Sequence, residues 1–237
     1  IKTADQIEQS NAITADEVIQ SRLSGDIRGI SRSGVPGIGS SLFIRGINSL
    51  NANAQPLFIV DGVIWNSLYD VTSIQQGFFS NSLENIDVND IESISVLKDG
   101  TSMYGSKASN GVVIIKTKRA SSMVTKINLS VLSGFVARPS GFPMMNGDQF
   151  RIYASDLVNT QETTGASRFE FLNADPSDVM VYNMYRNNTD WSDEVYQNGN
   201  VNSYNINVTG GDDKALYYFS LGYTGNKGVI KSTDMQR

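Results

Sequence analysis

The sequence predicts an α+β domain, built from a small mixed β-sheet with short helices, followed by the first antiparallel strands of a truncated transmembrane β-barrel. Two observations lead to this fold class. Up to about residue 119, short apolar runs bounded by Gly and Pro alternate with brief helical signals. Beyond that point, apolar and polar residues alternate strictly over lengths that suit membrane-spanning strands. With 237 residues, 40% of them apolar, the chain can also bury an ordinary core.

The residue inventory excludes several classes of function. The chain contains no cysteine and no histidine, so it offers neither a Ser-His or Cys-His pair nor an imidazole or thiolate ligand for zinc. We therefore expect no metal and no cofactor. The net charge is −5 and the basic cluster from Lys116 to Arg119 is short, so we expect no nucleic-acid partner.

The N-terminal part of the chain predicts one short helix. Residues 1–12 are polar and without a pattern, and we expect a loose lead-in to a domain covering 13–119. The run TADE from Thr14 to Glu17 has the spacing of a capping box, in which the hydroxyl and the carboxylate each accept a backbone N–H bond. This box predicts a helix that starts there and ends near Gly25.

Apolar runs predict the strands of the mixed sheet. They cover Ser41–Arg45, Leu57–Val60, Ser93–Leu97 and Val112–Ile115. The Asp61-Gly62 pair predicts a tight turn after the second run. A long polar and aromatic excursion occupies 64–84, and a helical turn is expected from Val88 to Ile91.

The region 120–237 predicts strands of the barrel type. Apolar or aromatic residues alternate with small or polar ones in the segments 126–131, 203–208 and 217–223. This dyad pattern is typical of a strand with one face toward lipid and the other toward the lumen. Only a tight turn separates the second and third segments, whereas about 65 residues separate the first and second. Because barrel loops are long outside and short in the periplasm, we expect an extracellular loop at about 134–200 that carries a helix around Phe150–Val158.

Three strands cannot close a membrane barrel. The smallest such barrels have about eight strands, and an open sheet edge in lipid would leave backbone groups unpaired. We therefore expect this chain to be a fragment of a longer protein.

Three blocks in this order carry a family resemblance. Together, LFIRG at Leu42–Gly46, PLFIVDGV at Pro56–Val63 and IESISVLKDGTSMYGSKASNGVVIIKTKR at Ile91–Arg119 resemble the plug domain of TonB-dependent outer-membrane transporters. The run SGVPG at Ser33–Gly37 resembles the SusC/RagA-like branch, which imports glycans and peptides in Bacteroidetes. The resemblance implies a plug at 13–119, the N-terminal part of the β-barrel at 120–237, and a place in the cell outer membrane.

The resemblance also implies a function and its partners. The expected function is plug-gated, TonB-dependent import of a glycan or oligopeptide, with no enzymatic activity. The expected partners are the TonB-ExbB-ExbD energising complex, whose contact segment we do not recognise in this chain, a SusD-like surface lipoprotein, the glycan or peptide substrate, and outer-membrane lipid. The alternative is a soluble extracellular polysaccharide-binding or adhesion module, in which the alternating segments form a β-sandwich.

Finally, the resemblance implies two groups of site residues. Three charged residues of the plug signature would make ionic contacts to the barrel wall: Arg45, Glu92 and Lys98. Without the resemblance, the same residues would be interpreted as solvated charges at strand ends. Aromatic and amide side chains after the Asp61-Gly62 turn would form the floor of a substrate site: Trp65, Asn66, Tyr69, Phe78 and Phe79. Phe78 and Phe79 could equally pack into the core of the plug. No flanking pattern supports a catalytic carboxylate pair, and Asp61, Asp87 and Asp90 are more simply read as turn residues.

Overall fold

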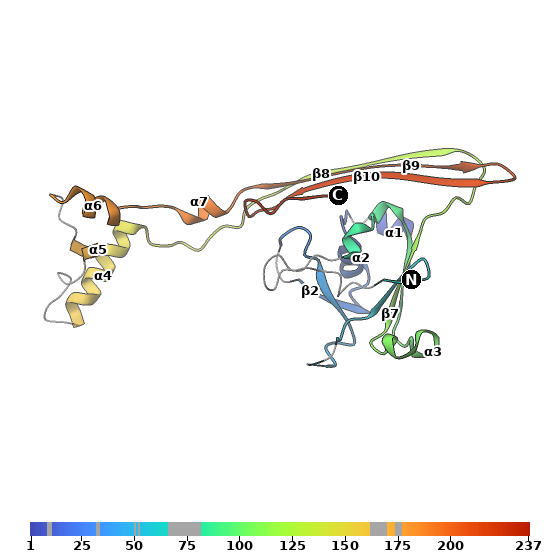
Figure 1. The fold of residues 1–237 in the computed structure, drawn as a ribbon, viewed down its shortest axis with the longest axis horizontal. Coiled ribbons are helices and arrows are strands. Elements are labelled where there is room, and N and C mark those ends of the chain that lie inside the picture. The colour runs from blue at the N-terminus through green and yellow to red at the C-terminus, as the bar shows by residue number, and fades with distance from the viewer. Residues whose placement is uncertain are drawn as a thin grey trace. The chain divides into compact units, whose positions relative to one another are not determined.

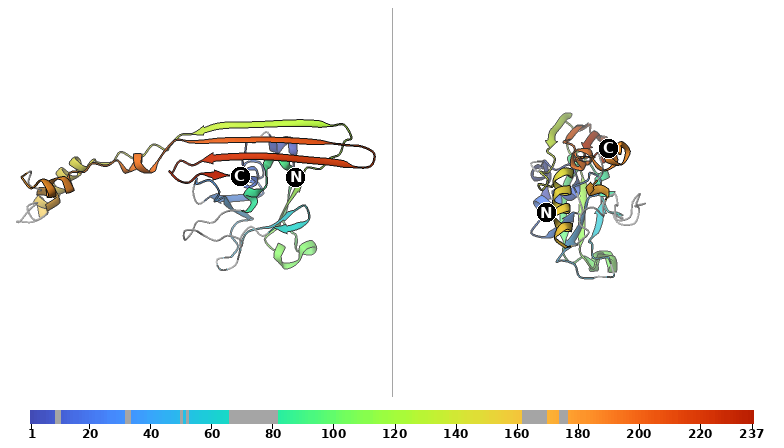
Figure 2. Two further views of the ribbon diagram at one scale, coloured as in Figure 1. Left: turned by 45° about the horizontal axis from the view of Figure 1, so that its top comes forward. Right: turned by 90° about the vertical axis from the view of Figure 1, so that its left-hand side faces the viewer.

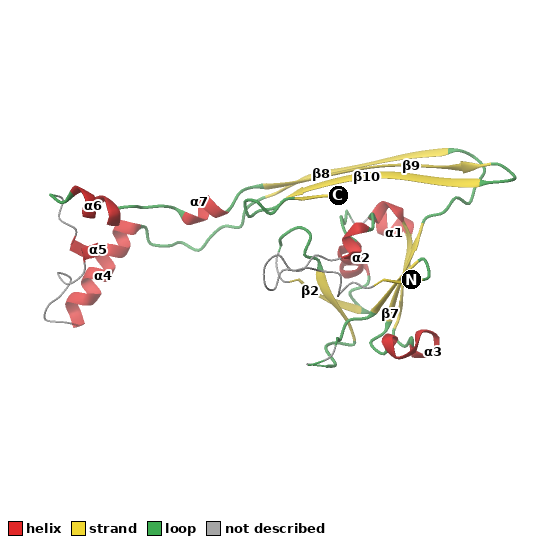
Figure 3. Cartoon of the chain, in the orientation of Figure 1, coloured by secondary structure: helices red, strands yellow, loops and turns green. Residues whose placement is uncertain are grey.

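The computed structural model describes residues 1–8, 11–31, 34–49, 51, 53–65, 82–161, 170–173 and 177–237 (Figure 1). The chain divides into two compact units. One unit consists of Ile1–Ala137 and Asn198–Arg237, and the other of Arg138–Gln197. The first unit contains all the long strands, whereas the second is helical (Figure 3). Each unit is described by itself below.

A five-stranded mixed sheet forms the centre of the N-terminal domain. Its order is β1 (Lys2–Thr3), β6 (Ile91–Leu97), β7 (Val112–Thr117), β4 (Leu57–Val60) and β5 (Val63–Trp65). Strands β4 and β7 are parallel, and the other neighbours are antiparallel. A separate hairpin pairs β2 (Ile27–Ser31) with β3 (Ser40–Ile44). The mixed sheet predicted from the apolar runs is thus confirmed.

Short helices accompany this sheet. The α-helices are α1 (Ala4–Glu8), α2 (Ala15–Arg22) and α3 (Thr101–Tyr104), and the 3₁₀ helices are η1 (Ser82–Asn85), η2 (Val88–Asp90) and η3 (Gly105–Ala108). Strand β4 is buried on both of its faces, with Phe58 in one apolar cluster and Ile59 in another. The first cluster joins the sheet to α1 and α2 through Ile7, Val18 and other residues, and the second lies against η3. Burial on both faces explains why this strand reads as a continuous apolar run.

The prediction of a loose lead-in at residues 1–12 is wrong. Lys2 and Thr3 pair with Ile94 and Ser93 at the edge of the mixed sheet, and Ile7 of α1 is only 1% exposed. Backbone pairing holds β1 without any apolar pattern, and a single buried isoleucine anchors α1. For this reason no hydrophobic periodicity marks β1 or α1 in the sequence.

The capping box and the turn are confirmed in their main features. The hydroxyl of Thr14 accepts a bond from the Glu17 N–H, and the Glu17 carboxylate accepts one from the N–H of Ile13 instead of Thr14. Asp61 and Gly62 adopt positive φ angles of 49° and 86°, as a tight hairpin turn requires. The turn leads directly into β5, a strand that the sequence does not predict.

Four antiparallel strands follow the mixed sheet in the order β11, β10, β9, β8 (Figure 2). Their bounds are β8 (Lys126–Val136), β9 (Gly199–Gly211), β10 (Leu216–Lys227) and β11 (Met235–Gln236). In register, Ile127 faces Val208, which in turn faces Phe219. The three predicted alternating strands are confirmed and are longer than predicted, and β11 was not predicted.

The faces of β8, β9 and β10 are inverted relative to a soluble sheet. The polar face of β9 is buried, and Asn205 there is only 1% exposed; on the same side of β10 Thr224 is buried, whereas β8 is exposed on both faces apart from the partly buried Leu132. The apolar face of the three strands is open, and Leu221 there is 63% exposed. A β-sandwich would bury these apolar side chains between two sheets. The observed arrangement is that of strands whose apolar face meets lipid.

The second unit carries the predicted helix. Its helices are α4 (Gly147–Gln161), α5 (Glu170–Asn173), α6 (Val179–Tyr185) and α7 (Trp191–Val195). Helix α4 begins at a reciprocal cap, in which the Asn146 side chain accepts from the Gln149 N–H and the Gln149 side chain accepts from the Asn146 N–H. None of the helices in the described parts of the chain is long and apolar enough to cross a membrane.

Candidate functional site

The candidate site is the surface where the N-terminal domain meets the polar face of β9 and β10. We call this polar face the inner face, and we call the residues from Ser82 to Asp90, which include η1 and η2, the 82–90 segment. The segment is short and carries three carboxylates, those of Glu84, Asp87 and Asp90. Its contacts to the inner face are polar.

Asp87 lies at the centre of these contacts. One of its carboxylate oxygens accepts a bond from the N–H of Asn89 at 2.9 Å and so caps η2. The other oxygen accepts from Nδ2 of Asn205, at 3.3 Å, and Asn205 also reaches the Ser220 hydroxyl at 3.2 Å. The predicted turn role of Asp87 is confirmed, and its contact with the strands is an additional role.

Gly222 makes the close approach of Asp87 possible. It pairs with Asn205 on the inner face, and a Cβ atom at this position would lie 2.4 Å from Oδ2 of Asp87. A side chain at position 222 would therefore have to displace the Asp87 carboxylate, which is held by Asn89 and Asn205. Glycine is favoured here by the closeness of the 82–90 segment, not by a positive φ angle.

Asp90 forms a second contact with the strands. Its carboxylate accepts a bond from the Tyr218 hydroxyl on β10 at 2.9 Å, and its backbone carbonyl accepts from the Lys118 N–H at 2.7 Å. One residue thus links η2 to β10 and to the chain that leaves β7. Hydrogen bonds to an ionised acceptor are among the stronger ones in proteins.

Arg237 forms the third contact. Its backbone pairs with Thr224 of β10 through two bonds of 2.9 Å. Its guanidinium donates to the backbone carbonyls of Glu84 and, at 3.2 Å, Ile86, and it lies 3.9 Å from the Asp87 carboxylate. Because the side chains of Arg237 and Asp87 are only 19% and 14% exposed, removal of either charge would leave the other poorly solvated.

Glu84 is a buried titratable group of this site whose pKa is shifted. Burial and the neighbouring Asp16 charge, with a smaller contribution from Glu17, raise the pKa of the Glu84 carboxyl to about 7. The positive charge of Arg237 and a bond from the Gly39 N–H act in the opposite direction. The protonation of Glu84 therefore changes in the neutral pH range.

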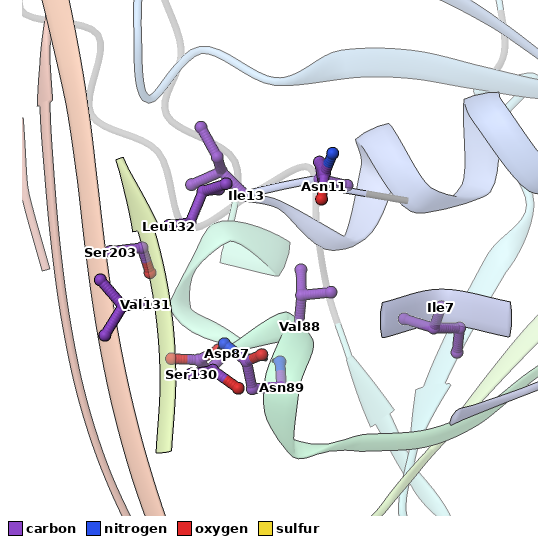
Figure 4. Close-up of a pocket in the computed structure, with 11 residues that line it drawn as sticks. Ile7, Asn11, Ile13, Asp87, Val88, Asn89, Ser130, Val131, Leu132 and Ser203 are labelled. Atoms are coloured by element: carbon purple, nitrogen blue, oxygen red, sulfur yellow. Dashed lines mark hydrogen bonds between the residues drawn. The ribbon is translucent and has the colours of Figure 1, made fainter. Parts of the chain in front are cut away.

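A cavity of about 230 Å³ lies beside these contacts (Figure 4). Its wall is mixed, as Figure 4 shows: Asp87, Asn89, Ser130 and Ser203 contribute polar groups, and Ile13, Val88, Val131 and Leu132 contribute apolar ones. The polar part of the wall can hold water molecules. The hydrogen bonds and the ion pair between the domain and the strands thus lie beside a space that water can enter.

Two of the three predicted ionic residues, Arg45 and Lys98, have partners within the N-terminal domain. Arg45 makes a bidentate pair with Asp99, at 2.9 and 3.0 Å, which lowers the pKa of that carboxyl. Lys98 pairs with Asp26 at 2.7 Å, and Glu92 is exposed. Their contacts to a barrel wall stay a prediction.

Most of the predicted substrate residues lie outside the described part of the chain. These residues are Asn66, Tyr69, Phe78 and Phe79. Trp65, at the end of β5, is half-buried and packs against the apolar core of the domain. The substrate role of the group stays a prediction.

Asp61 has the structural role that the sequence predicts. It accepts bonds from the backbone N–H of Thr117 at 2.9 Å and from the Thr117 hydroxyl at 2.7 Å. Burial alone would raise the pKa of the Asp61 carboxyl, but these bonds and the nearby Arg119 charge lower it on balance. Within the described residues there is no cluster of three carboxylates that could hold a metal ion.

The sequence analysis missed the residues that join the domain to the strands: Asp87, Asp90, Asn205, Tyr218, Gly222 and Arg237. One signal was present, because Asn205 and Tyr218 stand at the inner positions of alternating strands, where polar groups need partners. No local signal marks Arg237.

Comparisons with known proteins agree with this arrangement. The family described as "TonB-dependent Receptor Plug Domain" matches residues 1–112. The TonB-dependent receptor SusC of Bacteroides thetaiotaomicron is 32% identical over 97% of this chain and 21% of its own length. A TonB-dependent receptor of Formosa agariphila is 30% identical over 100% of this chain and 21% of its own length. The chain thus spans about a fifth of the length of these relatives.

A solved structure extends the likeness to the strands. The structure of the RagAB peptide transporter matches with a TM-score of 0.69 and 25% identity, over 96% of this chain and 26% of that chain. A match of this extent includes the mixed-sheet domain and the strands that follow it. TonB-dependent receptors of this kind are outer-membrane proteins, in agreement with the exposed apolar face of β8 to β10. The chain therefore belongs to the SusC/RagA-like TonB-dependent receptors and comprises their plug domain and the first strands of their barrel.

Proposed function

We propose that this chain gates the import of a glycan or oligopeptide across the outer membrane, as the plug and first wall strands of a TonB-dependent transporter. The observation that carries the proposal is the contact between the 82–90 segment and the inner face. A few hydrogen bonds and one ion pair beside a hydratable cavity hold the plug there. Water can replace such contacts, so the segment can leave the strands without exposing a large apolar surface.

In this proposal the remaining parts have matching roles. Residues 1–119 act as the plug, because β1 and α1 belong to its sheet and core, 120–237 begin the barrel, and the region at about 134–200 lies outside the cell. The TonB-ExbB-ExbD complex supplies the mechanical pull, and a SusD-like lipoprotein covers the substrate. Ligand on one side and pull on the other bias a two-state gate, and no covalent chemistry is needed. The residues after the Asp61-Gly62 turn contribute to the floor of the substrate site.

Uptake by living cells tests the cargo. A panel of labelled glycans and peptides is offered to cells that lack the full-length gene and to a complemented strain. We expect selective loss of one substrate and its recovery on complementation. If uptake of every substrate stayed unchanged while surface binding was lost, the adhesion module would be the better explanation.

A reversible tether tests the gate itself. Asp87→Cys and Gly222→Cys are combined in the full-length receptor, and because this chain has no cysteine, the two new thiols are the only ones in this part of the receptor. The close approach of these positions fits a disulfide. We expect the oxidised receptor to bind its cargo without importing it, and reduction to restore import relative to the two single variants. Normal import with the disulfide fully formed would contradict movement of the 82–90 segment.

A further inference from the structure

Three asparagine side chains of β8 and β9 form a continuous row of hydrogen bonds that ends on the plug. Nδ2 of Asn128 on β8 donates to Oδ1 of Asn207 on β9 at 2.9 Å. Nδ2 of Asn207 donates to Oδ1 of Asn205 at 3.4 Å. Nδ2 of Asn205 in turn donates to Oδ2 of Asp87 at 3.3 Å. We call the three asparagines the amide row, and every bond in it runs in the same direction, from the edge strand β8 toward the 82–90 segment.

The chemistry of Asp87 sets the direction of the amide row. A carboxylate can only accept hydrogen bonds, so the group of Asn205 that faces it must be the NH2 group and not the oxygen. The cap of η2 holds this carboxylate in place, because its other oxygen accepts from both the N–H and Nδ2 of Asn89, at 2.9 and 3.0 Å. Gly222, opposite Asn205, leaves room for the carboxylate.

The two inner members of the row cannot turn without losing bonds. Both hydrogens of the Asn205 amide are used, one by Asp87 and one by the Ser220 hydroxyl at 3.2 Å, and its oxygen accepts from Asn207. Asn205 is 1% exposed and Asn207 is 5% exposed, so water has little access to either amide. Half a turn of one amide would bring two oxygens or two NH2 groups together, and a buried polar group without a partner is costly.

We propose that Asn207 and Asn128 are positioning residues of the gate, because they turn the amide of Asn205 so that it donates to Asp87. Neighbouring bonds in such a row polarise and orient one another, so a change at one member reaches the next. A row that presents an NH2 group to the plug needs an acceptor at position 87, and Asp87 provides it. The inference rests on the proposed function and deepens it, since it names residues that hold the closed gate.

A substitution in the middle of the row tests this role. At pH 8, far above the ordinary pKa of an aspartate, the carboxylate introduced by Asn207→Asp can only accept, so it attracts the NH2 group of Asn205 and turns the Asn205 oxygen toward Asp87. We expect hydrogen exchange of the Val88–Asp90 amides in the full-length receptor to show about a fivefold to tenfold increase in opening. Asp87→Asn supplies a donor for the turned oxygen and keeps an oxygen for the cap, so in that background the same change should increase opening by less than about twofold.

A third background separates the turning of Asn205 from direct repulsion between two carboxylates. In Asn205→Ala no amide lies between positions 207 and 87, so the effect of Asn207→Asp should be the same with Asp87 and with Asp87→Asn. A dependence on position 87 that persists in this background would be direct repulsion and would overturn the proposal. Equal opening by Asn207→Asp with either residue at position 87, while Asn205 is intact, would also overturn it, because a general effect on the strands would not depend on position 87.

An exposed member of the row provides a second variant that buries no charge. Asn128→Asp should turn Asn207 and through it Asn205, and it should raise the same opening by about twofold to fivefold. Asn202→Asp on β9 is the matched control, because the Asn202 oxygen accepts from the Ser133 hydroxyl at 2.7 Å and a carboxylate keeps this bond. Equal opening in these two variants would overturn the proposal, even if Asn207→Asp does not fold. Hydrogen exchange involves no transport step, so failure here and failure of the uptake experiment are distinguishable.

Discussion

The mixed sheet and the four-stranded sheet of this chain bury residues of opposite polarity. In the mixed sheet of the plug, Ile94 and Ile115 are completely buried under helices and neighbouring strands. In the four-stranded sheet, Leu129 is 70% exposed, whereas Asn207 is buried. The mixed sheet buries its apolar side chains away from water, as soluble domains do, whereas the four-stranded sheet exposes its apolar side chains, as lipid-facing sheets do. Whether a face of a sheet is buried therefore depends on what that face contacts, and not on whether its residues are polar or apolar.

Polar groups of the 82–90 segment join the plug to the four-stranded sheet. The apolar core of the plug ends at the 82–90 segment, and beyond it Asp87 and Asp90 contact Asn205 and Tyr218. A purely hydrophobic contact at this place would cost more to separate, because separation would expose apolar surface to water. In the proposed gate, polar contacts therefore let the 82–90 segment leave the strands while the apolar core of the plug stays intact.

The largest expected effect comes from deletion of apolar volume inside the plug. Ile94→Ala removes a fully buried side chain and should lower the free energy of unfolding of the plug by about 2–5 kcal/mol. The matched change Ile127→Ala affects an exposed side chain on the lipid-facing side, and it should cost far less. Denaturant-dependent hydrogen exchange of the β6 and β7 amides in the full-length receptor measures the change in the free energy of unfolding for both variants. Equal costs for the two variants would contradict the comparison.

A charge on the apolar face of the second sheet should have the next largest effect. Leu221→Lys, on an exposed apolar position of β10, should cost about 2–4 kcal/mol if the residue lies near the middle of the bilayer. Leu216→Lys at the first residue of the same strand should cost only about 0–1 kcal/mol. The fraction of folded receptor recovered in outer membranes reports the difference. A tolerated lysine at 221 would show that this face does not meet lipid.

A smaller effect is expected where the sheets meet. Gly222→Ala places a methyl group 2.4 Å from the Asp87 carboxylate, and the displacement it forces should destabilise the contact by about 1–3 kcal/mol. Gly225→Ala in the same strand is the control, because its nearest neighbour, the Tyr223 hydroxyl, would lie at 3.4 Å. Faster hydrogen exchange of Val88–Asp90 in the first variant alone would support the proposed approach. Identical exchange in both would mean that the 82–90 segment does not lie against β10.

The smallest effect is expected for one hydrogen bond across the contact. Tyr218→Phe removes the donor to Asp90 and should weaken the plug contact by about 1–2 kcal/mol. Tyr223→Phe on the exposed face of the same strand should have almost no effect. The urea concentration at which the 82–90 amides lose protection compares the two. A larger loss of protection in the Tyr223→Phe variant would show that the inner and exposed faces of β10 are the reverse of those described here.

Much of the fold was predictable because its signals are local. The capping box at Thr14, the apolar run Leu57–Val60 and the Asp61-Gly62 turn each contain the chemistry that forms them. The alternating segments predicted the long strands, and the inverted faces agree with the barrel interpretation. Strand β1 was not predictable, because backbone pairing at a sheet edge needs no side-chain pattern.

The candidate site was less predictable than the fold. Asp87 reads as a turn residue and is one, yet its second oxygen faces a strand 118 positions further along the chain. Gly222 looks like any small residue of an alternating strand until the approach of Asp87 is known. Such contacts join residues that share no local pattern, so single-sequence reasoning can place each residue on a face but cannot pair it.

The sequence by itself determined the long strands β8, β9 and β10, the strands β3, β4, β6 and β7, the family of the plug, and the absence of cysteine and histidine chemistry. These properties depend on residue type and short spacing. Only the tertiary structure decided that Glu84 lies beside both Asp16 and Arg237, and that the polar face of β9 and β10 covers the 82–90 segment. The physical reason is that burial and electrostatic environment arise from groups distant in sequence, and these are brought together only when the chain folds.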